Sequence, residues 1–208
     1  MKENHAAENA LGTIGAVLWS IQIIPQIVKS YRSKSTFGLS GALMFIWAVA
    51  SLFLGSYNIA RKLSIPLQVQ PQIFGVLSAG SWAQCLHYGP RKFSKLKAGG
   101  CLAVFCVIFA GFESGSVYAL WAGQNNGTDA PVLFYGYMSA VLLAVALLPQ
   151  YYEIYKLKEV VGISLVFMAV DILGGIFSFL SLFFRNNLDI AAFVSPHAVN
   201  FLTFPNVW

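Results

Sequence analysis

Six long apolar runs dominate the sequence, at residues 11–30, 39–60, 65–88, 98–122, 131–152 and 163–184. Each is close to the roughly 20 residues that a helix needs to cross the hydrocarbon core of a bilayer. Only 10% of the 208 residues are charged, whereas a soluble domain carries about 25%. The sequence therefore predicts an all-α integral membrane protein with several spans, and the lipid bilayer as its first partner.

A seventh span is expected to be incomplete. An apolar run starts near Ile190 but contains Pro196, His197, Asn200 and Pro205, and the sequence ends at Trp208. Proline inside a helix removes a backbone hydrogen bond and strains the preceding turn. We interpret this segment as an atypical or truncated helix, and a truncated gene product stays open as an explanation.

The first span is expected to be retained in the mature protein. No basic segment precedes the apolar run that begins at Leu11, and no clear cleavage site separates it from a soluble domain. A secretory signal peptide normally shows both features. Residues 1–10 are therefore interpreted as a short tail and the run as a membrane span.

Basic residues in the loops predict the orientation. Nine lysines and arginines lie in the loops after the first, third and fifth spans, and four lie on the opposite side. Loops with more positive charge face the cytosol, so the N-terminus is expected in the lumen. A glycosylation sequon at Asn126 falls on the lumenal side and mildly supports this orientation. The net charge of +5 is thus read as orientation, and no nucleic-acid partner is expected.

The sequence contains an internal duplication. "IPQIVKSYRSKSTFGLS" at 24–40 matches "LPQYYEIYKLKEVVGIS" at 148–164, an offset of 124 residues. Without gaps, residues 12–54 and 136–178 are identical at 12 of 43 positions. Apolar composition explains shared Ala, Val and Leu, but not Pro-Gln, Tyr, Lys and Gly-x-Ser in one register.

The duplication predicts how the spans are grouped. Three helices reverse the direction of the chain, so a fourth must intervene before a copy can run in the same direction. We expect a first repeat at 11–90, a linker helix with its loops at 91–130, and a second repeat at 131–208. Some secondary transporters are built from such parallel repeats and bind substrate between them near the bilayer midplane.

The two Pro-Gln motifs, each followed by a charged loop and a Gly-x-Ser, resemble those of the PQ-loop family. Relatives in that family include cystinosin, fungal vacuolar basic amino acid transporters and, distantly, the SWEET sugar carriers. "IPLQVQPQIFGVLSAGSWAQCLHYG" at 65–89 looks like the fungal members. The resemblance covers residues 10–190. It implies two parallel three-helix bundles joined by a linker helix, with both motifs on the cytosolic side, and a seventh helix from which this sequence departs.

Pro25 and Pro149 lie late in the first and fifth spans. Each leaves the carbonyl four residues earlier, at Ile21 and Val145, without its helical donor. Lipid offers no substitute donor, so neighbouring helices must face these kinks. The matched pair favours two hinges at a cytosolic gate over two static kinks.

The glutamines and serines of the same motifs have simpler interpretations. Gln26 and Gln150 either hydrogen-bond across the protein or lie solvated at the membrane interface. Ser40 and Ser164 each precede an apolar run. Serine in that position is typical of a helix N-cap.

Asp171 is the most informative single residue. It lies nine residues after Gly162, or about 13 Å along a helix, near the expected midplane. A charged residue at that depth is costly and usually faces a cavity. The residue at the equivalent position of the first repeat is Trp47. A carboxylate and an aromatic ring can hold a cation together, so both are candidates for a substrate or proton site; a protonated structural aspartate is the alternative.

Three further polar residues are weaker candidates. Glu113 lies in "GFESG", a small-xxx-small stretch that favours close helix packing and a structural contact. Gln68 and Gln72 share one helix face and would line a polar cavity near the lumenal mouth. No metal-ligand pattern, cofactor motif or catalytic constellation is found in the sequence, so an enzyme is not expected.

The resemblance and Asp171 together favour one function. We expect a carrier of a small cationic amino acid, Lys, Arg or His, across a vacuolar or lysosome-like membrane by alternating access, with a co-transported proton as an open question. A carrier of a neutral solute such as sugar or cystine, and a receptor or sensor that does not transport, stay open as alternatives. The oligomeric state is left undetermined.

Overall fold

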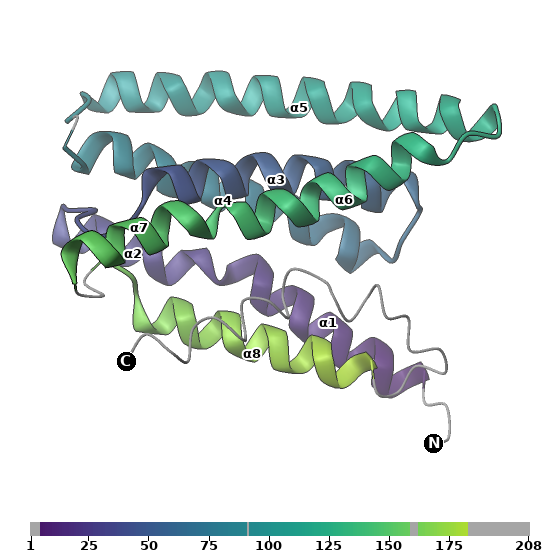
Figure 1. The fold of residues 1–208 in the computed structure, drawn as a ribbon, viewed down its shortest axis with the longest axis horizontal. Coiled ribbons are helices and arrows are strands. Elements are labelled where there is room, and N and C mark those ends of the chain that lie inside the picture. Colours follow the sequence, from purple (N-terminus) through teal and green to yellow (C-terminus); the bar gives the residue numbers. More distant parts are fainter. Residues whose placement is uncertain (1–4, 91, 159–161, 183–208) are drawn as a thin grey trace.

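The computed structural model describes residues 5–90, 92–158 and 162–182, and in these ranges the chain is built from helices (Figure 1). They are α1 (His5–Ile21), α2 (Ile23–Ser33), α3 (Gly41–Ala60), α4 (Ile65–Tyr88), α5 (Lys95–Asn125), α6 (Ala130–Val145), α7 (Leu147–Leu157) and α8 (Leu165–Leu182). The segment predicted as a seventh span lies outside the described residues. The grouping into two complete bundles and a linker therefore stays a prediction.

In the described residues, each of the first six predicted spans forms a helix or a broken pair of helices, which confirms the all-α membrane class. Four segments are long and apolar enough to cross a bilayer: Asn9–Ser33, Gly41–Ala60, Lys95–Asn125 and Ala130–Leu157. The 24 residues of α4 are long enough but include four glutamines, which lower its hydropathy. The apolar part of α8, Leu165–Ser178, is shorter.

The predicted proline kinks are present, and they occur at equivalent positions of the two repeats. The first span breaks at Gln22, between α1 and α2, and the fifth breaks at Ala146, between α6 and α7. These positions are 124 residues apart. Each break follows the residue whose carbonyl lost its donor, Ile21 or Val145, as expected for a proline four residues later.

The ends of α2 and α7 are equivalent as well. Lys34 and Lys158 follow the two helices in the left-handed conformation, with φ of 51° and 56°. Residues other than glycine rarely adopt this conformation. Each ammonium lies over the tyrosine three residues earlier, 3.4 Å from the ring centroid of Tyr31 and 4.2 Å from that of Tyr155. The attraction between cation and ring helps to hold both turns.

The helices pack within the first repeat and between the two repeats, and the contacts between the repeats form an equivalent pair. In the first repeat α4 contacts α1, α2 and α3, and α5 lies along α3 and α4 (Figure 1). Between the repeats, α1 packs on α8 and α3 packs on α6. Because α6 is the copy of α1 and α8 the copy of α3, these two contacts are the same contact made twice. The repeats thus associate with approximate two-fold symmetry.

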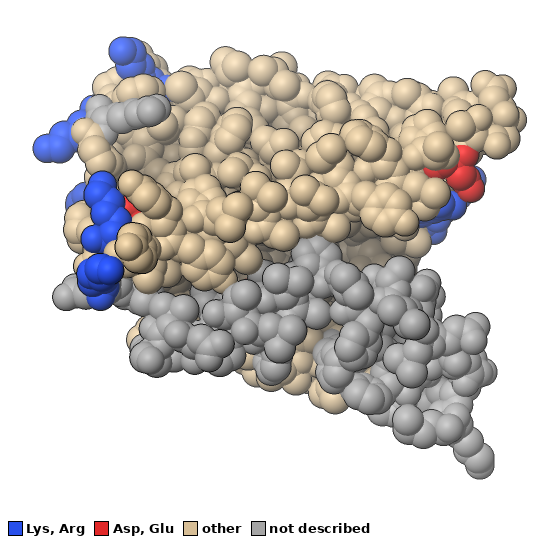
Figure 2. Space-filling model, viewed as in Figure 1, with Lys and Arg blue, Asp and Glu red and all other residues tan. Residues whose placement is uncertain are grey.

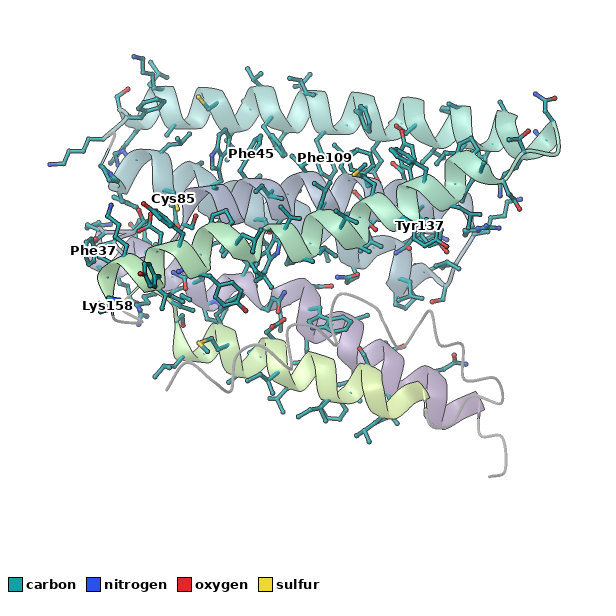
Figure 3. All side chains as sticks on the ribbon, viewed as in Figure 1. Phe37, Phe45, Cys85, Phe109, Tyr137 and Lys158 are labelled. Carbon is teal, nitrogen blue, oxygen red and sulfur yellow. The ribbon has the colours of Figure 1, made fainter. Side chains whose placement is uncertain are left out.

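Apolar side chains pack the two repeats and α5 together. The main core combines residues of both repeats around the two helix breaks, including Ile23, Met44, Trp47, Leu147 and Phe167. Aromatic rings hold α5 to the first repeat: Phe45 of α3 lies 5.1 Å from Trp82 and 5.8 Å from Phe105, between centroids (Figure 3). The core therefore lies where the repeats meet.

Charge separates to the two ends of the molecule. Lysines and arginines gather at the end where α2 and α7 finish and α5 starts, and on the face that Figure 2 shows, the surface between the two ends that is not drawn in grey carries no charged side chain. We call this the basic end. At the opposite end Arg61 pairs with Asp129 at 3.6 Å, with both side chains partly in solvent. This distribution agrees with the loop charges that predicted the orientation.

Candidate functional site

The two Pro-Gln glutamines each bind the Gly-x-Ser loop of the other repeat. Gln26 donates from Nε2 to the Gly162 carbonyl at 3.1 Å, and its Oε1 accepts from the Ser164 amide at 2.7 Å. Gln150 donates to the Gly38 carbonyl at 2.8 Å and accepts from the Ser40 amide at 2.9 Å. We call this arrangement the glutamine clasp.

The clasp is buried. Gln26 is 1% exposed and Gln150 is 3% exposed. Of the two interpretations that the sequence left open, hydrogen bonding across the protein is therefore the one the structure shows. A side-chain amide offers one donor and one acceptor group, so it can satisfy both backbone groups of an extended loop. The same four bonds tie the repeats together beside the basic end.

The two loops also touch each other through glycine. A Cβ added to Gly162 would overlap the backbone of Gly38 and Leu39. Gly38 has φ of +80°, which favours glycine for a second reason. The shared Gly-x-Ser is thus explained: glycine permits the contact, and serine caps the next helix. Ser40 Oγ accepts from the Leu43 amide and Ser164 Oγ from the Phe167 amide, both at 3.4 Å, which confirms the predicted N-caps.

Lys29 adds a bond that the sequence did not predict. Its ammonium donates to the Ile163 carbonyl at 2.8 Å, so a residue of α2 again binds the opposite loop. The equivalent residue of the second repeat is Glu153, an acid, so this contact has no symmetric copy. Its position three residues after Gln26 is the only sequence signal, because both then lie on one face of α2.

Trp47 supports one of the helix breaks. Its indole Nε1 donates to the Leu143 carbonyl at 3.4 Å, just before the break at Ala146. The ring is 4% exposed and lies 5.5 Å from Phe74 and 6.0 Å from Phe167, between centroids. The acceptor is Leu143 and not Val145, the carbonyl that Pro149 leaves without its helical donor, so the prediction that neighbouring helices satisfy the freed carbonyls stays a prediction.

Asp171 lies on the face of α8 that contacts both α1 and α3. Phe167, four residues earlier, packs against Trp47 of α3. Gly174, three residues later, packs against Trp19 of α1, since a Cβ there would lie 2.7 Å from Trp19 Cδ1. Residues three and four apart share one helix face, so Asp171 lies on the stripe between the two tryptophans. Among the described residues, no hydrogen bond or ion pair to its half-buried carboxylate is found.

The weaker candidates separate into two different contacts. Gln72 of α4 donates to Glu113 of α5, and both side chains cover Gly55 of α3, where a Cβ would overlap them. Glu113 is buried, and its carboxyl group connects α5 to α4 through Gln72 and lies against Gly55 of α3. Gln68 instead donates to the Leu63 carbonyl in the loop between α3 and α4, at 2.5 Å.

The predicted glycosylation residue and the question of a metal site can also be examined in the structure. Asn126 is exposed at the C-terminal cap of α5, at the end opposite the basic end. Among the described residues, no group of three or more His, Cys, Asp and Glu side chains converges as metal ligands would.

Taken together, these observations define a class: a helical membrane protein made from two parallel copies of one unit, closed against each other at the basic end. A family model for the PQ-loop repeat matches the chain twice, at residues 7–67 and 132–190. The chain belongs to the PQ-loop repeat family. The two matches cover both breaks, both glutamines and both Gly-x-Ser loops.

Curated relatives extend over most of the chain. An uncharacterized protein of Schizosaccharomyces pombe is 38% identical over 92% of this chain and 67% of its own length. An uncharacterized membrane protein of Saccharomyces cerevisiae is 34% identical over 90% of this chain and 61% of its own length. A cystinosin homolog of Dictyostelium discoideum is 27% identical over 87% of this chain and 67% of its own length. The match thus spans about two thirds of the length of these relatives.

Proposed function

We propose that this protein is a membrane transporter that moves a small cationic solute, Lys, Arg or His, by alternating access between its two repeats. Membership of the PQ-loop repeat family and the likeness to a cystinosin homolog support transport. The single observation that supports a cationic substrate is Asp171. Its carboxylate lies in a span, at the contact between the repeats, without a partner in the described part of the chain.

Burying a carboxylate without compensation is costly, because it loses hydration that the protein does not replace. A transported cation provides the missing charge when it binds. The residues beside Asp171 fit this role, since Trp19 and Trp47 contact the same α8 stripe one turn away on either side. The indole ring is the strongest cation–π acceptor among the side chains.

Alternating access also requires a gate, and the glutamine clasp provides one. In this structure the two loops at the basic end are in backbone contact and joined by four buried hydrogen bonds. Solute can leave at that end only after the clasp opens. The helix breaks at Gln22 and Ala146 lie one turn from the clasp and supply the places to bend. We assign the basic end to the cytosol and the opposite end to the lumen of a vacuolar or lysosome-like compartment.

The assignment is tested by uptake of labelled arginine and lysine into vesicles that contain the purified protein. Asp171→Asn keeps the size of the side chain and removes its charge. Because removing one partner of a buried charge pair costs roughly 2–5 kcal/mol, uptake should fall more than about tenfold. Repeating the assay with and without a pH gradient shows whether a proton moves with the solute.

Glu113→Gln is the matched control, since it removes a second buried carboxyl group within a span but keeps an acceptor for Gln72. It should leave uptake near the wild-type rate. Full uptake by folded Asp171→Asn protein would contradict a cationic substrate held at this position. Competition by cystine or sugar but not by lysine would identify a neutral solute, and binding without uptake would identify a receptor.

A further inference from the structure

Gln22 has a buried polar side chain that takes no part in the clasp, although its backbone N–H donates to the Leu18 carbonyl as in a helix. It lies at the break between α1 and α2, four residues before Gln26, and it is 4% exposed. Its Oε1 is buried, and among the described residues it has no hydrogen-bond partner. Leaving a buried acceptor without a hydrogen bond costs about 1–3 kcal/mol. A ligand that brings an N–H group to this oxygen would recover that energy.

The register of α1 against α8 shows what lies opposite Gln22. Trp19 meets Gly174, and nearer the basic end Gln26 meets Ser164. The helices run in opposite directions. Gln22 and Asp171 each lie three residues, about 4.5 Å of helical rise, from the Trp19–Gly174 contact toward the basic end. The two residues are therefore at the same level of this interface.

Both residues also lie on the contacting faces. Gly15, Trp19, Gln22 and Gln26 follow a spacing of four, three and four residues, which keeps them on one side of the first span. Gly15 and Trp19 contact α8, and Gln26 contacts the loop before it. On α8, Asp171 belongs to the stripe that includes Gly174 and Ser178. Two acceptors, an amide oxygen and a carboxylate, thus lie at one level with Trp19 adjacent, and neither has a donor in the described chain.

We propose that Gln22 and Asp171 form the two sides of a binding site for a protonated amine. This inference rests on the proposed function and narrows its substrate class. The carboxylate requires a positive charge, and the Gln22 oxygen requires an N–H group. Ammonium and guanidinium groups carry both. A quaternary ammonium carries the charge but no N–H, so this site discriminates against it although the tryptophan rings alone would not.

The test compares butylammonium with butyltrimethylammonium, which differ in their N–H groups, by direct binding to the full-length protein in lipid nanodiscs. Labelled lysine serves as a third probe. Hydrogen bonds to charged groups are strong enough that wild-type protein should bind butylammonium roughly tenfold or more tightly than the quaternary probe. In Gln22→Ala protein the two affinities should become nearly equal, because only the butylammonium affinity falls.

The chain supplies controls for folding. The equivalent break in the second repeat has alanine, Ala146, so alanine is compatible with this backbone. Gln84→Ala removes another glutamine whose buried Oε1 has no partner in the described chain, but which faces α2 through its bond to the Ile27 carbonyl. It should keep the wild-type preference for butylammonium.

The outcomes separate this inference from the broader proposal. If wild-type protein binds lysine and Asp171→Asn does not, yet Gln22→Ala keeps the full preference for butylammonium, Gln22 is no part of the site and the cation carrier stands. If wild-type protein binds none of the three probes, both proposals are wrong. If folded Gln22→Ala protein still binds both amines but no longer prefers butylammonium over butyltrimethylammonium, the result supports a site formed by Gln22 and Asp171.

Discussion

At the scale of single residues, one side-chain amide makes both hydrogen bonds to the opposite loop, as donor and as acceptor. Gln26 and Gln150 each satisfy a backbone donor and a backbone acceptor of the opposite loop. A glutamate in either position would keep the acceptor and lose the donor. It would also place a carboxylate against a carbonyl oxygen, which is repulsive in a buried setting.

Gln26→Glu and Gln150→Glu should therefore open the basic end. Losing one buried hydrogen bond and leaving a carbonyl unsatisfied costs about 1–3 kcal/mol, so the open population should rise roughly fivefold or more. A cysteine at Ile163, a position that is 5% exposed, reports the opening through its rate of labelling by a membrane-impermeant maleimide. The three native cysteines are replaced by alanine first.

Gln124→Glu changes the same residue type at the opposite end of the molecule and should leave the labelling rate unchanged. Equal rates in all three variants and the parent would mean that the clasp does not hold this end closed. A faster rate in only one of the two clasp variants would show that the two halves contribute unequally, which Lys29 gives reason to examine.

At the scale of elements, each broken helix pair combines a longer half with a half of 11 residues. α1 packs on α8 and α6 packs on α3, whereas α2 and α7 are 11 residues each and are followed by the loops of the clasp. Proline prevents the two halves from forming one continuous hydrogen-bond ladder. The break is also supported from outside, since Trp47 donates to the Leu143 carbonyl.

Pro25→Ala and Pro149→Ala should slow transport if the breaks move. Alanine restores a donor for the carbonyl of Ile21 or Val145, and a net gain near 1 kcal/mol would favour the straight helix and reduce the uptake rate roughly fivefold. Uptake kinetics of labelled lysine in vesicles measure the effect. The double variant should be slower than either single variant, because each repeat contains one break. Unchanged kinetics in all three would reduce both prolines to static kinks.

At the scale of the whole molecule, duplication makes the packing between the repeats symmetric, whereas several side chains along that interface differ between the two copies. The α1–α8 and α6–α3 contacts are equivalent, and so are the breaks, the left-handed lysines and the glutamine bonds. The copies differ at Lys29, which corresponds to Glu153, and at two positions further from the basic end. Asp171 corresponds to Trp47, and Gln22 corresponds to Ala146. Under the proposed function, the symmetric frame would rock between two states while the unlike residues Asp171 and Gln22 bind the solute.

A reversible cross-link between the two loops tests this motion. Leu39→Cys and Ile163→Cys place thiols in the two loops, which are in backbone contact through Gly162. In the background without native cysteines, a disulfide or a short bifunctional thiol reagent should stop uptake of lysine almost completely. Reduction of the disulfide should restore it. Each single-cysteine variant is the control, and full uptake by cross-linked protein would show that the basic end does not need to open.

Much of this protein follows from its sequence alone. Long apolar runs predict helices, because a helix satisfies every backbone hydrogen bond within the segment that lies in lipid. The basic residues in the loops predict the orientation of the spans. The repeated Pro-Gln and Gly-x-Ser predicted equivalent kinks and N-caps, since proline and serine act on the backbone within one turn. The structure confirms these elements and moves their ends by a few residues, as for α5, which begins at Lys95 instead of residue 98.

The tertiary structure decided which segments meet. Gln26 and the Gly-x-Ser loop at 162–164 are 136 or more residues apart, and no local pattern pairs them. Likewise the sequence marked Asp171 and Trp47 by their equivalent positions, but only packing placed Gln22 and Trp19 along the same interface. Proline kinks and serine caps depend on residues within one turn of helix, so the sequence predicts them. Contacts between the repeats depend on how two whole surfaces fit together, so only the tertiary structure shows them.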